Sequence, residues 1–529
     1  MRCGSFFPPA RGGPECLESM SDQPIPEQRQ KKLEAIIGLG YEAFPSRFNP
    51  THPIDKIVVK YNSTTKEVLA SNKVQVRLGG RIMTIRGHGK AGFADLALGG
   101  HRIQIYVRCD SVGEKGFSLY KLLDLGDWVG VEGYLFRTKT EQLTVHVEKL
   151  HFLSKALLPL PEKWHGLTDV ELRYRQRYMD LASNPDTQNR FVKRSRMISS
   201  LRTLLESRGF FEVETPMMQL VPGGALARPF KTHHHALDID LFMRIAPELY
   251  LKRLIVGGFE RVFEINRSFR NEGISTQHNP EFTMLELYQA FADYQDIMGL
   301  TEELIRGAAE ATISSLEISY IDKPISFSKF SRYTLREAIC EFWPGRMEKP
   351  KLEDFQDETS LKRWTEEYNR WASQTGGSNL DIPEGTLAGK VLVSLFEVVC
   401  EKHLWQPTFI QDFPIEVSPL AKQKPNEPKF VERFELYIAG MEVANAFSEL
   451  NDPIEQRRRF KEQQSSREKG DMKAHAIDED YVRALCYGMP PTGGLGIGID
   501  RLAMILTNSP SIRDVILFPL LRPEKIKSH

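Results

Sequence analysis

The chain has 529 residues, with 70 Lys and Arg against 70 Asp and Glu, so its formal net charge is zero. With 41% hydrophobic residues it can bury sizeable cores, which excludes disordered and collagen-like proteins. The length predicts roughly three domains at about 150 residues each. Charge balance excludes a uniformly basic nucleic-acid binder but not a local basic face, because binding depends on where the charges lie.

The six cysteines are scattered without CxxC spacing, so the sequence predicts neither a zinc site nor a disulfide framework and favours a reducing cytoplasm. No stretch approaches the roughly 18 to 20 consecutive apolar residues of a membrane-spanning helix, so no membrane partner is expected. Residues 1–24 begin with prolines and glycines instead of an apolar core, which predicts a disordered N-terminal extension and no signal peptide.

The next two segments differ in their hydrophobic pattern. In residues 25–72, Leu33, Ile36 and Ile37 recur at helical spacing and predict a helical segment. Residues 73–153 instead hold five short alternating runs, the pattern of a small closed β-barrel of the OB type. Such barrels bind single-stranded nucleic acid with basic and aromatic side chains.

A Pro-rich linker and a basic helix are predicted over residues 154–182. In this helix Arg173, Arg175 and Arg177 are interleaved with tyrosines. Both a solvated surface helix and a nucleic-acid contact would explain that pattern.

Residues 183–529 predict an α+β domain. Apolar residues at three- and four-residue steps predict a long helix up to Gly209, followed by a strand that ends at Pro216. Alternating runs over 237–290 predict an antiparallel sheet with one wet and one dry face. A helical insertion is expected at about 320–400, and the sheet resumes after it. The predicted fold class is α+β multidomain, a five-stranded barrel followed by an antiparallel sheet flanked by helices.

One predicted strand carries polar and aromatic side chains on a single face. Residues two apart in a strand point the same way, so Phe282, Met284, Glu286 and Tyr288 share a face. An unpaired buried carboxylate is costly. A face that presents Glu among aromatic rings therefore predicts the wall of a pocket.

A second polar face carries Asn445, Phe447 and Glu449 on one strand parity. Before it come Glu435 and Glu442, seven residues apart. Two such carboxylates can meet across a turn and hold a hard divalent cation, or they can form a solvated charge pair.

These stretches, with a Gly-rich strand after them, resemble the three signature motifs of the class II aminoacyl-tRNA synthetases. The resemblance covers about residues 25–524 and is strongest to the lysine-specific family of the bacterial type. It implies ATP-dependent activation of L-lysine to lysyl-adenylate and transfer of the lysyl group to the 3′ end of lysine tRNA. Residues 183–529 would then be the catalytic domain, and 73–153 the anticodon-binding domain. The runs that carry it are RYRQRYMDL, EVETPMM, PGGALARPF, RIAPELYLKR, FRNEGIS, HNPEFTMLELY, NAFSELND and GLGIGIDR.

For ATP, the resemblance implies two catalytic arginines and a magnesium ion. Arg270 would bridge the lysine carboxylate and the α-phosphate, and Arg501 would lie above the adenine ring. Glu435 and Glu442 would hold Mg²⁺. The implied ATP-binding residues are Arg270, Glu272, His278, Asn279, Phe282 and Arg501.

For lysine, a selective pocket should offer carboxylates and a hydroxyl to the side-chain ammonium. The resemblance implies that Glu449 and Tyr288 hold the ε-ammonium and that Glu248 and Gly224 hold the α-amino group. Glu248 and Glu286 could instead be structural carboxylates paired with arginines. The implied lysine-binding residues are Gly224, Glu248, Arg270, Glu286, Tyr288, Asn445, Phe447 and Glu449.

In the barrel, Phe93 and Gln104 match positions that contact anticodon bases in the family. A third such position falls at Glu141 or Gln142, and Gln277 stands where many relatives carry Arg. The resemblance further implies a cytoplasmic homodimer. Two other functions stay open at this point: an enzyme that uses lysyl-adenylate to modify a translation protein, and a non-catalytic tRNA-binding paralogue.

Overall fold

The structure is a computed structural model. Contacts within the chain divide it into two units, residues 1–189 with 521–529 and residues 190–520. The predicted extension at 1–24 and part of the predicted linker lie outside the described residues. The structure describes residues 25–160, 168–345, 348–355, 357–468 and 477–523.

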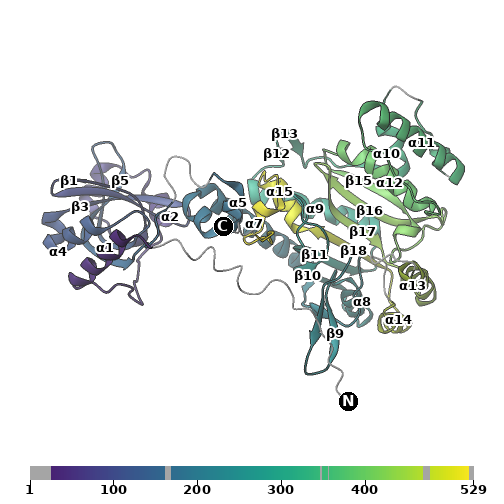
Figure 1. Cartoon of the computed structure of the whole chain (residues 1–529), viewed down its shortest axis with the longest axis horizontal. Coiled ribbons are helices and arrows are strands. Elements are labelled where there is room, and N and C mark those ends of the chain that lie inside the picture. Colours follow the sequence, from purple (N-terminus) through teal and green to yellow (C-terminus); the bar gives the residue numbers. More distant parts are fainter. Residues whose placement is uncertain (1–24, 161–167, 346–347, 356, 469–476, 524–529) are drawn as a thin grey trace, which may run out of the picture. The chain divides into compact units, whose positions relative to one another are not determined.

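The first unit contains a closed barrel of five strands in the order β1-β2-β3-β5-β4, as the alternating runs predict (Figure 1). Alternate residues such as Leu78, Ile105 and Val145 point inward and are fully buried. The pairing is antiparallel except between β3 and β5, which run parallel and close the barrel. The strands are β1 (Gln75–His88), β2 (Ala91–Leu98), β3 (His101–Arg108), β4 (Trp128–Arg137) and β5 (Leu143–Ser154).

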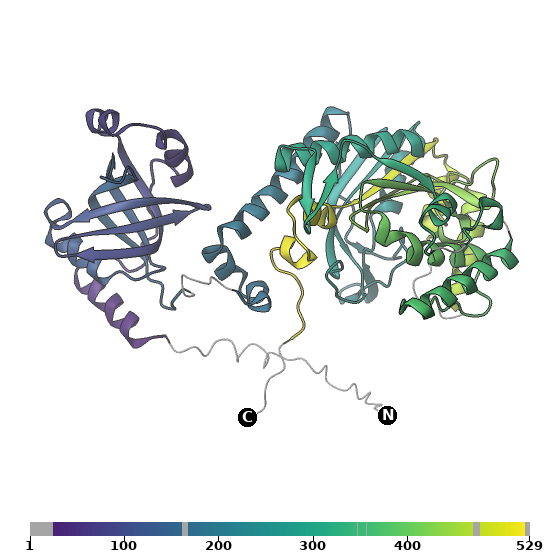
Figure 2. The same ribbon diagram turned by 90° about the horizontal axis from the view of Figure 1, so that it is seen from above.

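Helices accompany the barrel in this unit. The predicted N-terminal helix is present as α1, drawn in purple beside the barrel in Figure 2, and its Ile36 joins the barrel core. In the predicted basic helix, Arg177 is fully buried and pairs with Asp180, which also accepts a hydrogen bond from Arg173. The helices are α1 (Glu27–Gly38), α2 (Ile54–Tyr61), α3 (Lys66–Asn72), α4 (Cys109–Leu122), α5 (Val170–Arg175) and α6 (Arg177–Ser183).

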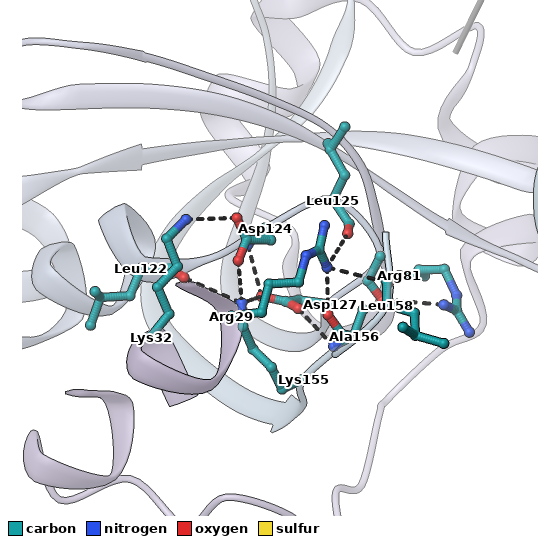
Figure 3. Close-up of polar contacts among 11 residues, drawn as sticks. Arg29, Lys32, Arg81, Leu122, Asp124, Leu125, Asp127, Lys155, Ala156 and Leu158 are labelled. Carbon is teal, nitrogen blue, oxygen red and sulfur yellow. Dashed lines mark hydrogen bonds and ion pairs between the residues drawn. The ribbon is translucent and has the colours of Figure 1, made fainter. Parts of the chain in front are cut away.

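A buried ionic network ties α1 and the end of β5 to the loop between α4 and β4 (Figure 3). The ammonium of Lys155 lies 2.7 Å from carboxylate oxygens of both Asp124 and Asp127. Lys32 of α1 contacts the other oxygen of Asp124 at 2.6 Å. Arg29, also of α1, donates to the backbone carbonyls of Leu125 and Ala156. One buried and one partly buried carboxylate are thus matched by two ammonium groups.

The second unit is built on an eight-stranded sheet in the order β14-β15-β16-β17-β18-β11-β10-β6. Its centre is antiparallel, as predicted. Its two edges are parallel, where β14 pairs with β15 and β6 with β10. The strands are β6 (Phe211–Glu212), β10 (Arg261–Phe269), β11 (Glu281–Ala290), β14 (Ser331–Thr334), β15 (Thr408–Pro414), β16 (Phe430–Ile438), β17 (Met441–Ser448) and β18 (Thr492–Gly498).

Two smaller sheets join strands that the sequence pattern partly predicts. One pairs β12 with β13, and the other has the order β7-β9-β8. Residues 317–334 therefore form short strands, and the helical part of the expected insertion begins only at Leu335. The strands are β7 (Met218–Gln219), β8 (Lys231–His234), β9 (Ile239–Met243), β12 (Glu317–Tyr320) and β13 (Lys323–Ser326).

One helix departs from the sequence expectation of alternating strands over 237–290. Residues 248–256 form α8, whose buried stripe includes Glu248 and Lys252 besides leucine and isoleucine. Because two charged residues occupy that stripe, the apolar helical period does not show in the sequence. The helices are α7 (Pro185–Ser207), α8 (Glu248–Val256), α9 (Tyr294–Ile313), α10 (Leu335–Phe342), α11 (Glu358–Thr375), α12 (Ala388–Cys400), α13 (Pro453–Glu468), α14 (Glu479–Cys486), α15 (Ile499–Leu506) and α16 (Ile512–Val515).

The two faces of the large sheet have different partners. Leu285 and Leu287 of β11 point into an apolar core shared with α9 and α15. Glu286 and the other residues of β11 that share its parity point to the opposite face. No helix among the described residues is both long enough and apolar enough to cross a membrane.

Candidate active site

The face of the sheet opposite α9 and α15 carries a cavity of about 400 Å³. The strand parity predicted from the sequence is confirmed, because Phe282, Met284, Glu286 and Tyr288 all line it. Glu435 is not among the residues that line the cavity. Gln277, which stands where many relatives carry Arg, does line it. The other predicted site residues of this unit lie together in the lining: Gly224, Glu248, Arg270, Glu272, His278, Asn279, Phe282, Glu286, Tyr288, Glu442, Asn445, Phe447, Glu449 and Arg501.

The glycines of β18 form the floor of this cavity. Gly494 pairs in register with Tyr288 on one side and Phe447 on the other, and Gly496 pairs with Glu286 and Asn445. A Cβ at Gly494 would overlap the carboxylate of Glu449 and the ring of Tyr288. Glycine therefore lets the side chains of two strands meet over the backbone of a third.

Cations gather at one end of the cavity. The guanidinium of Arg270 lies 5.0 Å from the ring centroid of Phe282, within cation–π range. Arg501, at the start of α15, donates to the backbone carbonyl of Glu442 at 2.6 Å and lies 3.1 Å from Nε2 of His278. This end suits a polyanion stacked on an aromatic ring. The predicted place of Arg501 above an adenine stays a prediction.

The loop between β10 and β11 presents an imidazole and an amide to this end. Burial and the charge of Arg501 lower the pKa of His278, so its ring is neutral at pH 7 and Nε2 accepts from Arg501. Ser275 Oγ fixes the other ring nitrogen at 2.9 Å. Asn279 donates to the carbonyl of Glu281 at 2.7 Å, and its buried carbonyl oxygen has no partner among the described side chains and backbone.

The other end of the cavity is acidic and closed. Tyr288 donates to Glu286 at 3.2 Å, and both are buried. Burial, followed by the charge of Glu248, raises the pKa of Glu286 to about 8. Glu449 is 1% exposed, and its Oε1 has no hydrogen-bond partner in the described part of the chain. Such a group is expensive to bury, so this end is built for a cationic donor.

Gly224 brings a loop against this end. Its φ of 88° lies in the left-handed region, which favours glycine. A Cβ there would lie 2.9 Å from that of Glu248 and 3.0 Å from that of Ala246. The backbone at Gly224 thus approaches Glu248 closely. Both could then contact the same small group of a ligand.

Glu435 and Glu442 lie on the neighbouring strands β16 and β17. Glu435 accepts from Arg433 at 2.5 Å and from Tyr437 at 2.7 Å, one bond to each oxygen. Burial and repulsion from Glu442 raise its pKa to about 7. Within the described ranges, no three His, Cys, Asp or Glu residues are placed to hold a metal. The pair still fits Mg²⁺, which commonly takes one or two carboxylates and completes its shell with phosphate oxygens and water.

Several residues near the site were not found from the sequence. Arg433 lines the cavity and donates to Asn445 at 3.2 Å, and Lys252 lies buried between Glu248 and Glu449. Glu397 of α12 and Glu401 of the turn after it were also not found. Burial, then the charges of Glu397 and Glu442, raise the pKa of Glu401 to about 7. The spacing of Glu248 and Lys252, one helical turn apart, is the one signal that could have been used.

The barrel of the first unit carries the predicted anticodon residues on one outer face. The ring of Phe93 stacks on Tyr106 at 4.5 Å between centroids. Gln104 lies two residues from Tyr106 on β3, where Thr144 donates to it at 3.0 Å. Glu141 and Gln142 are both exposed at the turn before β5. An aromatic platform beside a fixed amide suits stacked, edge-read bases.

Comparisons with known proteins cover nearly the whole chain. The family model for tRNA synthetases class II (D, K and N) matches residues 169–522, and that for the OB-fold nucleic acid binding domain matches residues 76–153. Similar proteins include the lysine–tRNA ligases of Pelotomaculum thermopropionicum, Enterococcus faecalis and Bacillus subtilis. They are 52%, 50% and 49% identical to it, over 94%, 96% and 96% of this chain and 94%, 98% and 98% of their own.

Proposed function

The chain belongs to the class II tRNA synthetases (D, K and N), and we propose that it activates L-lysine with ATP and transfers the lysyl group to the 3′ end of lysine tRNA. The observation that carries the proposal is the closed acidic end of the cavity, where Glu449 presents a buried oxygen to which none of the described residues donates. A lysine ammonium is the donor that matches it. The cationic end of the same cavity suits ATP.

In the first step the lysine carboxylate attacks the α-phosphate of ATP, and pyrophosphate leaves. Two anions must meet, so positioning and charge neutralisation carry most of the rate. Arg270, at the cationic end of the cavity, would bind both the carboxylate and the α-phosphate. Phe282 would stack on the adenine, with Glu272 accepting from its amino group. Arg501 and His278 would contact the phosphates.

Magnesium would be held by Glu435 and Glu442, and when bound it neutralises charge on the ATP phosphates. Arg433 and Tyr437 orient Glu435 by bonding one oxygen each. These two bonds leave lone pairs on both oxygens for a cation.

In the second step the ribose hydroxyl at the 3′ end of tRNA attacks the lysyl carbonyl, and AMP leaves. The barrel over 73–153 would select the tRNA by its anticodon, with Phe93 and Gln104 as base contacts. Its presence favours this function over a protein-modifying enzyme. The retained Arg270, Phe282 and Arg501 favour it over a non-catalytic paralogue.

We further propose that the protein acts in the cytoplasm as a homodimer. Phe211 and Phe259 support a subunit interface near the strand after α7, because their stacked rings are 59% and 43% exposed. Contiguous exposed apolar patches commonly mark interaction surfaces. Sedimentation of the active enzyme as a monomer would contradict this assignment.

The test is lysine-dependent exchange of pyrophosphate into ATP, followed by charging of tRNA with a UUU anticodon. We expect Glu449→Gln to lower kcat/KM for lysine roughly 100- to 5,000-fold, because breaking a buried ion pair costs about 3 to 5 kcal/mol. Glu281→Gln, at an exposed position of β11 in the same eight-stranded sheet, is the matched control and should stay near wild type. Exchange without charging would favour the protein-modifying enzyme, and neither activity the paralogue.

A further inference from the structure

A cation of the chain itself lies behind the acidic end of the cavity. The ammonium of Lys252, on α8, is completely buried and does not line the cavity. It lies 2.6 Å from Oε1 of Glu248 and forms a second ion pair with Oε2 of Glu449. A ligand in the cavity therefore meets the two carboxylates and not the lysine.

Lys252 joins two segments that are about 200 residues apart in sequence, the start of α8 and the end of β17. Its ammonium is also enclosed by aromatic rings, 5.3 Å from the centroid of Phe447 and 5.9 Å from that of Tyr288. Burial alone would lower the pKa of Lys252, but attraction to Glu248 and Glu449 outweighs burial and raises it above its usual value. Lys252 is thus positively charged at pH 7, while burial raises the pKa values of Glu248 and Glu449 above their usual range.

Each bridged carboxylate keeps an oxygen for another partner. Oε1 of Glu449 is buried, without a partner in the described residues, and it occupies the space that a Cβ at Gly494 would take. The backbone and the bridge together leave Glu449 no freedom to follow a shorter ligand. Under the proposed function, Glu248 takes the α-amino group and Glu449 the ε-ammonium.

We propose that Lys252 is a positioning residue that fixes the spacing between Glu248 and Glu449 and so makes the pocket select lysine over its shorter homologue ornithine. This inference rests on the proposed function. Ornithine is one methylene shorter, and a purely apolar pocket discriminates one methylene by only about 10- to 200-fold. With both carboxylates fixed, ornithine leaves one of them unpaired in a buried site, which sets a far larger penalty.

The test compares lysine and ornithine in pyrophosphate exchange by the full-length enzyme and by Lys252→Met, which keeps the bulk of the side chain and removes its charge. We expect kcat/KM for lysine to fall at least 100-fold and the ratio of lysine to ornithine to fall at least tenfold. A merely structural role would lower both amino acids equally. A ratio within twofold of wild type in folded Lys252→Met overturns the inference.

A second variant covers the case in which Lys252→Met does not fold because it leaves buried carboxylates unmatched. Lys252→Met with Glu449→Gln removes both charges of one pair, which proteins tolerate far better than removal of one. Because Glu449 itself binds the ligand under the proposed function, the double variant is compared with Glu449→Gln alone: its lysine-to-ornithine ratio should be the lower of the two, and an equal ratio overturns the inference. Wild-type enzyme without lysine-dependent exchange would instead refute the proposed function itself.

Discussion

The pH dependence of lysine binding follows from Glu286. Burial and the neighbouring Glu248 raise the pKa of Glu286 to about 8, so this carboxyl is mostly protonated at pH 7 before lysine binds. The two ammonium groups of lysine favour the ionised form and lower that pKa. Binding therefore releases a proton. Since the pKa is higher in the free enzyme, affinity for lysine rises with pH up to about 8 and levels off above it.

The size of the effect follows from the pKa in the free enzyme. With a pKa of about 8, roughly one molecule in eleven has Glu286 ionised at pH 7, and roughly one in a hundred at pH 6. If binding requires the ionised form, the KM for lysine should be about tenfold above its limiting value at pH 7 and about 100-fold above it at pH 6. About 0.9 proton should be released for each lysine bound at pH 7.

Two measurements test this linkage. Calorimetric titration with lysine in two buffers of different ionisation enthalpy gives the number of protons released, and exchange kinetics from pH 6 to 8.5 give the KM. Glu286→Gln keeps an acceptor for Tyr288 but cannot titrate, so its KM should lose the dependence. A wild-type KM that varies less than twofold over this range, or an equal slope in Glu286→Gln, would refute the reasoning.

Three further changes have defined expectations. Gly494→Ala places a methyl group in the space of the Glu449 carboxylate, so the KM for lysine should rise about 100-fold while the KM for ATP, measured in the same exchange assay, changes little. Tyr437→Phe removes one of the two bonds that orient Glu435, so half-maximal exchange should need about tenfold more Mg²⁺. Lys155→Met leaves a fully buried carboxylate without its ammonium (Figure 3), and urea unfolding followed by barrel tryptophan fluorescence should show a loss of about 3 to 5 kcal/mol.

The barrel could be predicted because its strands are local patterns. Each run alternates, and the inward residues such as Leu78 and Val145 are apolar throughout, so period and number of strands are both visible in the sequence. The parallel pairing of β3 with β5 is set by contacts between distant segments. No local pattern encodes it, and the same holds for the parallel edges of the large sheet.

The candidate site shows the same division between local and distant information. Strand parity was enough to place Glu286 and Tyr288 on one wall, and the resemblance to a family assigned roles that stay predictions. Lys252 and Arg433 were missed because a charged residue usually indicates a solvated surface. The burial of Lys252 depends on Glu449, which the fold brings from a distant segment, and that contact only the structure reveals.

The carboxylates at the acidic end favour a ligand with two amines. Glu248, Glu286 and Glu449 supply three carboxylates, and Lys252 supplies one ammonium. Lysine adds two ammonium groups. Its carboxylate is not counted here, because under the proposed function it pairs with Arg270. Three negative groups then face three positive ones. An amino acid with a neutral side chain leaves one carboxylate unmatched, which must stay protonated or go unpaired in a buried site. Net charge thus excludes most amino acids before shape discriminates among the cationic ones.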